Sequence, residues 1–190
     1  MKKRLVWLLV FALVLGMLTG CTRGIREKKN ATTDEKTSAS QYGYDSMDDA
    51  IQAYLEISLA YDAPTKAELK RAQPKDRWEY DEDQGKDFYS QYEEFVEESQ
   101  SVRDNMKNLF GDSYTLSFDI LEKDKLKGDD FDDACSDLAE VGMDQDLMES
   151  LYEFELEVMV DGDDTETIEA TGGAYKYDGR WYVAFLDVDN

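Results

Sequence analysis

Three things are missing from this sequence: histidine, a supply of basic residues over most of its length, and an apolar run long enough to cross a membrane. No histidine occurs among the 190 residues. Its absence excludes Ser-His-Asp and Cys-His catalysis, and it argues against a typical zinc site. No enzyme activity and no cofactor are predicted.

Basic side chains are scarce beyond the first part of the chain. Residues 43–190 hold 41 of the 44 acidic residues and 13 of the 21 basic ones, a net charge of −28. A field of this sign repels nucleic acid and anionic lipid, so neither is expected as a partner of these residues. It favours cations or basic proteins, and solubility alone is the plainest explanation.

The one long apolar run is too short to span a bilayer. Every residue from Leu5 to Leu15 is apolar, whereas a transmembrane helix needs about 20 such residues. A basic start at residues 2–4, a short apolar core and small residues before a break are the layout of a secretory signal peptide. We therefore expect residues 1–20 to be removed.

The end of this segment, Leu18-Thr19-Gly20-Cys21, closely resembles the lipobox of bacterial lipoproteins, Leu-x-[Gly/Ala]-Cys. The resemblance implies cleavage before Cys21 and a diacylglyceryl group on its sulfur. Two acyl chains give stable anchoring, since each buried methylene contributes roughly 0.8 kcal/mol. The membrane is then a partner, and the protein lies on its extracytoplasmic side. The alternative is an ordinary signal peptide whose cleavage region contains a cysteine by chance.

Residues 21–42 are expected to be a flexible tether that begins at the lipidated cysteine. They contain little apolar material and no periodicity. Four basic residues lie directly beyond the anchor, namely Arg23, Arg26, Lys28 and Lys29. These residues suit a position against anionic lipid head groups, and a solvated spacer that happens to be basic explains them equally well.

Residues 43–190 are expected to form one domain of ordinary size, with most of its helices first. Apolar spacing of three and four residues predicts helices over residues 46–61, 66–72, 86–110 and 129–141, with a loop between the second and the third. Ser46 is the expected N-cap of the first helix. The seam of the third helix also suits a coiled coil. However, it covers just over three heptads and precedes strands, which favours a helix packed on a sheet.

Alternating polarity predicts strands over residues 114–121, 152–160, 165–177 and 180–188. The clearest is YEFELEVMV, in which five apolar residues alternate with three glutamates. Asp178-Gly179 is a strong hairpin signal between the last two strands. Cys135 falls on the apolar face of the last helix, so we expect a buried, inert thiol and no disulfide framework.

This order of elements predicts an α+β fold, with one curved antiparallel sheet of about four strands covered on one face by the long helix. The layout looks like the NTF2-like (cystatin-like superfold) domains of bacterial lipoproteins, especially those of Gram-positive bacteria. The ending DGRWYVAF is similar to the DGKWY hairpin that many of them carry. The resemblance covers about residues 46–188. It implies a fold but no single function, because this fold hosts unrelated roles.

Two acidic stretches are candidate cation sites of a kind other than an EF-hand. Around Asp81, Glu82 and Asp83, no register places a glycine at the sixth position of a calcium loop. The second stretch comprises Asp129, Asp130, Asp132 and Asp133. For both stretches the alternative is a solvated acidic surface.

Four aromatic residues are the candidates for binding a ligand or partner: Trp78, Tyr80, Trp181 and Tyr182. Tryptophan and tyrosine are favoured at interfaces because they combine apolar area with a polar group. Trp78 lies in a polar stretch and is the expected exposed anchor, whereas Trp181 is expected to close the core. Some NTF2-like relatives are isomerases that use a buried carboxylate and a tyrosine. That resemblance makes Asp119 and Tyr175 or Tyr182 the candidates for such roles, although no spacing selects them.

The sequence therefore predicts a lipid-anchored, extracytoplasmic lipoprotein with one NTF2-like domain. Its expected role is non-catalytic binding of an envelope protein or a small ligand. The alternatives are an acidic module that binds divalent cations and a small isomerase-like enzyme. No residue indicates the oligomeric state.

Overall fold

A computed structural model describes residues 42–188 of the chain. The expected signal peptide, Cys21 and the expected tether as far as residue 41 lie outside this range. No helix among the described residues is both long and apolar enough to cross a bilayer.

The described chain forms four helices, a strand, a further helix and a three-stranded meander, which agrees with the order expected from the sequence except for one additional helix, α3, before the first strand. The helices are α1 (Met47–Leu59), α2 (Lys66–Arg71), α3 (Lys75–Asp83), α4 (Phe88–Phe110) and α5 (Asp129–Glu140), with a 3-10 turn η5 (Gln145–Leu147). The strands are β1 (Thr115–Lys125), β2 (Met148–Asp161), β3 (Thr165–Tyr177) and β4 (Arg180–Val188).

Short polar side chains fix where the helices begin. Ser46 caps α1 as expected, because its Oγ accepts a hydrogen bond from the Asp49 amide at 3.0 Å. Thr65 and Glu68 form a reciprocal capping box at α2. The long helix α4 ends at Gly111, whose φ of +89° is unfavourable for residues with a side chain.

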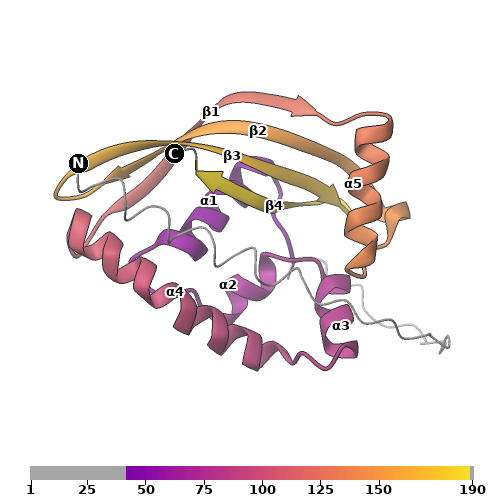
Figure 1. The fold of residues 1–190 in the computed structure, drawn as a ribbon, viewed down its shortest axis with the longest axis horizontal. Helices are drawn as coiled ribbons and strands as arrows, with labels where there is room; N and C mark the ends of the chain where they lie inside the picture. The colour runs from indigo at the N-terminus through magenta and orange to yellow at the C-terminus, as the bar shows by residue number, and fades with distance from the viewer. Residues whose placement is uncertain (1–41, 189–190) are drawn as a thin grey trace.

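The four strands form one antiparallel sheet in the order β1-β2-β3-β4, and the sheet is visibly curved (Figure 1). Asp178 and Gly179 both have positive φ, +47° and +76°, as a two-residue hairpin turn of type I′ requires. The predicted boundaries of β3 and β4 are confirmed. The strands β1 and β2 are each longer than expected, because β1 continues past a bulge near Leu121 to pair with the start of β2.

The main core lies between the sheet and the helices α1 and α4. The inward side chains of β2, Phe154, Leu156, Val158 and Val160, pack there together with Ile51 and Leu55 of α1 and Val102, Met106 and Phe110 of α4. The expectation that the long helix covers the sheet is corrected in one respect. The helix that lies directly against β1, β3 and β4 is α1, and α4 contributes side chains from its C-terminal half.

The other face of the sheet is covered only at one end, by α5 (Figure 1). Cys135 of α5 packs there with Leu151, Tyr175 and Tyr182, which are paired across β2, β3 and β4. The expected burial of Cys135 is confirmed, and this burial raises the pKa of its thiol, which disfavours the reactive thiolate.

The loop expected between the second and third helices is wrong, because residues 75–83 form the helix α3. Its sequence, KDRWEYDED, is highly polar, and only Arg77, Trp78 and Asp81 are buried. These three residues share one helical face, at spacings of three and four residues. Two of them are charged, so the apolar periodicity that identifies a helix in sequence is missing.

Candidate functional site

Trp78, the expected exposed anchor, is buried, so this expectation is wrong. Only 6% of its surface is exposed, and it packs with Ile57 and Leu69 in a small cluster beside the main core. Its ring meets that of Phe88 edge to face at a centroid distance of 5.0 Å. The indole N–H donates to the backbone carbonyl of Lys70 at 2.9 Å. Truncating Trp78 therefore tests stability rather than binding.

The other three aromatic candidates lie in separate places rather than in one patch. Tyr80 is half-buried on α3. Trp181 is half-buried against the main core, with its ring centroid 5.7 Å from that of Tyr152. Tyr182 is buried beneath α5, stacked on Tyr175 at 5.4 Å. The structure thus does not bring the four aromatic residues together.

The acidic candidates on α3 are also separated. Asp81 is 3% exposed and forms an ion pair with Arg77, whose Nε lies 3.4 Å from its Oδ2. The Arg77 guanidinium also donates from Nη1 to the carbonyl of Val141 at 3.3 Å. Glu82 and Asp83 are exposed. Asp81 therefore serves to hold α3 against the segment that follows α5.

The second acidic stretch forms the first turns of α5. All four of its aspartates are exposed, and negative charge at that position suits the helix dipole. Among residues 42–188, no group of three or more histidine, cysteine, aspartate or glutamate side chains is arranged to hold a metal ion.

The residues considered for an isomerase-like site are not adjacent. Asp119 is exposed on β1, whereas Tyr175 and Tyr182 are buried under α5. The structure contains a different contact between a carboxylate and a tyrosine. The Tyr177 hydroxyl donates to Asp76 Oδ2 and accepts from the amide of Asp144 at 3.0 Å.

The Tyr177 contact joins residues from three parts of the fold, since Asp76 lies in the first turn of α3 and Asp144 directly before η5. Burial is the main cause that raises the pKa of Tyr177, and the hydrogen bond to Asp76 adds to it. The Tyr177 hydroxyl both donates and accepts in this contact, and both bonds join it to another element. No sequence signal pointed to it, because Asp76 and Tyr177 are 101 residues apart.

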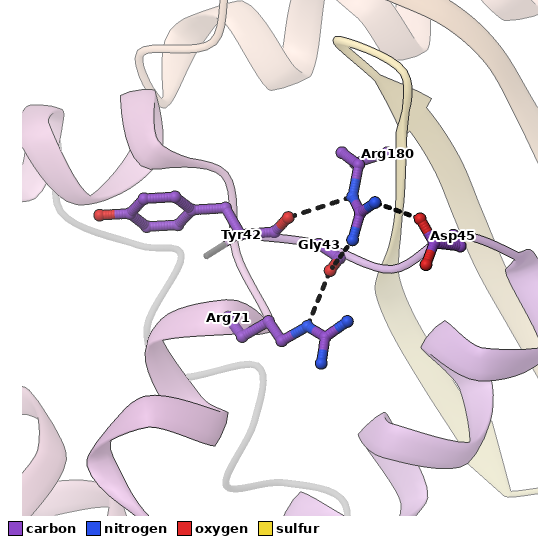
Figure 2. A network of polar contacts seen from close by, with 5 residues as sticks. All are labelled: Tyr42, Gly43, Asp45, Arg71 and Arg180. Carbon is purple, nitrogen blue, oxygen red and sulfur yellow. Dashed lines mark hydrogen bonds and ion pairs between the residues drawn. The ribbon is translucent and has the colours of Figure 1, made fainter. Parts of the chain in front are cut away.

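A network of arginines fixes the first described residues to the last strand (Figure 2). The guanidinium of Arg180 donates to the carbonyls of Tyr42 at 3.3 Å and Gly43 at 3.0 Å, and it forms an ion pair with Asp45. Arg71 donates from Nε to the same Gly43 carbonyl at 2.9 Å. Figure 2 shows this carbonyl between the two guanidinium groups.

Backbone bonds reinforce this network. Tyr44 and Trp181 exchange two backbone hydrogen bonds, of 3.1 and 2.9 Å, as a short extension of the sheet. Gly43 has a φ of +65°, and a Cβ there would lie 2.6 Å from the Tyr182 ring. Only glycine satisfies both conditions. The sequence assigned this segment to the end of the tether or the start of the domain, and nothing in it indicated the contact.

The largest feature without a structural role is the part of the sheet that α5 leaves open. Side chains alternate along a strand, so the neighbours of the buried residues of β2 point away from α1. The register places nine acids on that side: Asp119, Glu122, Asp124, Glu153, Glu155, Glu157, Asp161, Glu169 and Asp187. We call these residues the outer acidic face.

Like charges lie directly opposite one another on the outer acidic face. Asp119 pairs with Glu157, and Glu157 pairs in turn with Glu169. Glu122 lies opposite Glu155 in the same way. No lysine or arginine takes part in any of these pairs. Facing like charges destabilise a sheet by roughly 0.2–1 kcal/mol per pair, so a positively charged partner would relieve this repulsion.

Two large apolar side chains are exposed on the same side of the sheet. Met159 and Phe185 are 40% and 38% exposed. Met159 lies opposite Thr167, and Phe185 packs over Gly173. The open face therefore offers apolar contact area beside its negative charge.

No protein family, no curated protein and no solved structure shows significant similarity to this chain.

The buried ion pair on α3 can be tested against an exposed one on the same helix. We expect Asp81→Ala to lower the free energy of unfolding by about 3–5 kcal/mol, because Arg77 would stay buried without its counter-charge. Glu79→Ala removes the partner of Lys75 in an exposed pair of the same spacing, and the expected loss is within about 0.5 kcal/mol. Urea unfolding followed by tryptophan fluorescence measures both, and equal losses would contradict the assignment.

The buried tyrosines predict a loss of stability in alkali. Burial raises the pKa of Tyr177, and it raises the pKa of Tyr114 to about 12, whereas an unfolded tyrosine titrates near pH 10. The folded state therefore binds these protons more tightly than the unfolded state does. The free energy of unfolding keeps this contribution below about pH 10 and loses it as the pH rises towards 12 and beyond. Tyr177→Phe should make this fall shallower. Tyrosinate absorbance that developed fully near pH 10 while circular dichroism showed a folded chain would contradict it.

Proposed function

We propose that this chain is a lipid-anchored, extracytoplasmic bacterial lipoprotein whose folded part is a non-catalytic binding module for a basic protein segment at the cell envelope. The observation that carries the binding role is the outer acidic face, an open side of the sheet with facing carboxylates and two exposed apolar side chains. The anchoring role rests on the Leu18–Cys21 motif and on the signal-peptide layout before it.

We further propose that the domain is NTF2-like. Helices on one side of an antiparallel sheet, a helix between β1 and β2, and a closing three-stranded meander support this assignment. The Asp178-Gly179 turn that joins β3 to β4 lies within the DGRWYVAF motif on which the resemblance rests.

The polar contacts of the helix layer favour binding over catalysis. Asp81 is neutralised by Arg77, and Asp76 and Tyr177 bond to each other. General acid–base chemistry needs a group that can reach a substrate with a suitable pKa, and these side chains are occupied in holding α3 to β3 and to the segment that follows α5. The outer acidic face offers area and charge instead, which suit recognition of a cationic surface.

The distance between Cys21 and Tyr42 sets how far the module can work from a membrane. The 21 intervening peptide steps span at most about 70 Å when fully extended. A basic partner within that distance of the membrane is therefore within reach of an anchored copy.

Anchoring is tested by Cys21→Ser. We expect this variant to leave the membrane fraction and to appear in the extracytoplasmic soluble fraction, because the sulfur that would carry the acyl chains is gone. The matched control is Cys135→Ala, which changes the other cysteine and should stay in the membrane fraction. A Cys21→Ser variant that sediments with membranes like the unaltered chain would refute the anchor.

The binding face is tested by reversing its charge. Crosslinking and purification of the full-length chain from its native membrane should recover a partner with a basic surface, and recovery should fall with increasing salt. In a Glu157→Lys/Glu169→Lys variant we expect recovery to fall by about tenfold or more, since two facing charges change sign.

The matched control is Glu94→Lys/Glu98→Lys, which makes the same change in net charge on exposed positions of α4. It should retain the partner. Equal losses in both variants would show attraction by net charge alone. Retention in both would place the binding surface elsewhere on the domain. Recovery of no protein partner by the unaltered chain would leave a small ligand as the alternative.

A further inference from the structure

Arg103 is the most unusual charged residue of the helix layer. It lies on α4 and is 2% exposed, as deeply buried as the largest apolar side chains of the core. Its Nη2 donates to the carbonyl of Val96 at 2.8 Å. Its Nε and Nη1 are buried and have no hydrogen-bond partner within the described part of the chain. Up to three N–H protons therefore lack an acceptor.

The comparison with Arg77 shows how unusual this is. Both arginines are buried on neighbouring helices of a strongly acidic domain, but Arg77 is neutralised by Asp81. The acid next to Arg103 in sequence, Asp104, is exposed and accepts a hydrogen bond from Gln100 at 2.9 Å. A buried charge without a counter-charge is strongly unfavourable, and a buried donor without an acceptor calls for an explanation such as a bound ion.

Polar groups lie near Arg103 although its helix neighbours Val102 and Met106 are core residues. Tyr114, Asp104 and Tyr92 are near enough to interact with its charge, and the carboxylate of Asp104 forms no ion pair with it. Tyr92, on α4, donates its hydroxyl to the carbonyl of Pro64 in the connection between α1 and α2, and Tyr114, which lies just before β1, donates to the carbonyl of Leu59 at the end of α1. The guanidinium is thus near two tyrosines that bond to the end of α1 and to the connection that follows it.

We propose that Arg103 is the binding residue for a small carboxylate, which supplies the missing acceptors and counter-charge near the α1–α2 connection. A planar carboxylate can accept two parallel hydrogen bonds from a guanidinium. A single negative charge is also favoured over a double one, because the domain as a whole is negative and repels a dianion more strongly. This inference goes beyond the proposed function, since it needs neither the lipid anchor nor the outer acidic face.

A direct binding measurement tests it. The probe is isotopically labelled formate, and its NMR line width is followed as the full-length chain is added in detergent. We expect saturable broadening that excess unlabelled formate reverses. Arg103→Met should bind about tenfold or more weakly, because hydrogen bonds to a charged group are lost. Lys107→Met is the matched control one turn along α4, where the ammonium lies 3.8 Å from the Tyr61 ring centroid, and it should bind as the unaltered chain does.

A second variant and a second measurement keep the test decisive if Arg103→Met does not fold. Arg103→Lys keeps the charge but loses the fork of donors, and it should also bind about tenfold more weakly. In thermal unfolding at constant ionic strength, replacing chloride by formate should raise the Tm of the unaltered chain by a few degrees and leave that of the Arg103 variants unchanged.

Two results would overturn the proposal. One is the absence of saturable broadening with the unaltered chain. The other is equal broadening, or an equal rise in Tm, in the unaltered chain and in a folded Arg103 variant, which would show a general effect of formate. A higher Tm of Arg103→Met in chloride does not count for either side, because removing an unpaired buried charge stabilises a protein whether or not the charge binds a ligand.

Discussion

The strand β2 lies in the interior of the sheet, bonded to β1 on one side and to β3 on the other. Its side chains alternate between the core and the solvent. Phe154, Leu156 and Val158 enter the core, and the glutamates between them face outwards. A shift of register by one residue would bury the glutamates and expose the core residues. The same alternation therefore fixes the sheet and creates the outer acidic face. The negative surface is a direct consequence of how the core is specified.

Charge is handled differently inside the helix layer. Several polar groups that leave the surface there are bonded to another part of the chain, as Arg77 is to the carbonyl of Val141 and Tyr177 to Asp76. These contacts hold the polar helix α3, which has little apolar surface of its own, against the rest of the fold. Arg103 departs from this pattern, since two of its three guanidinium nitrogens are buried without an acceptor. The contrast within one layer is why Arg103, and not the many exposed charges, carries an inference about a ligand.

The sequence was sufficient where a single period governs a segment. The strands β3 and β4 and the cap of α1 at Ser46 follow from local patterns, and the structure confirms them. It was insufficient for α3, whose buried face is two-thirds charged, so that no apolar period marks it. Trp78 was misjudged for the same reason, since a polar neighbourhood in sequence indicated exposure while the helix turns this one ring inwards.

The candidate site was less predictable than the fold. The outer acidic face depends on which residues pair across β1, β2 and β3, and composition predicts its charge but not its register. The contact of Tyr177 with Asp76, the position of Arg103 and the role of α1 as the helix on the sheet all depend on tertiary packing. Each joins residues far apart in the chain, and local spacing carries no information about them.

The arginine network at Tyr42–Asp45 connects the fold to the proposed role of the chain. If residues 21–41 tether the domain, any pull from the membrane reaches it at Tyr42. That point is held by Arg180 and by the two backbone bonds between Tyr44 and Trp181. Arg180 and Trp181 are the first two residues of β4. Because these bonds are strand-like, a force applied at Tyr42 acts on the sheet, where hydrogen bonds join all four strands. The force therefore does not act first on α1, which begins only three residues after Tyr44. A module that binds through its sheet while anchored at one end needs this kind of attachment, because the binding surface and the anchor then belong to the same rigid element.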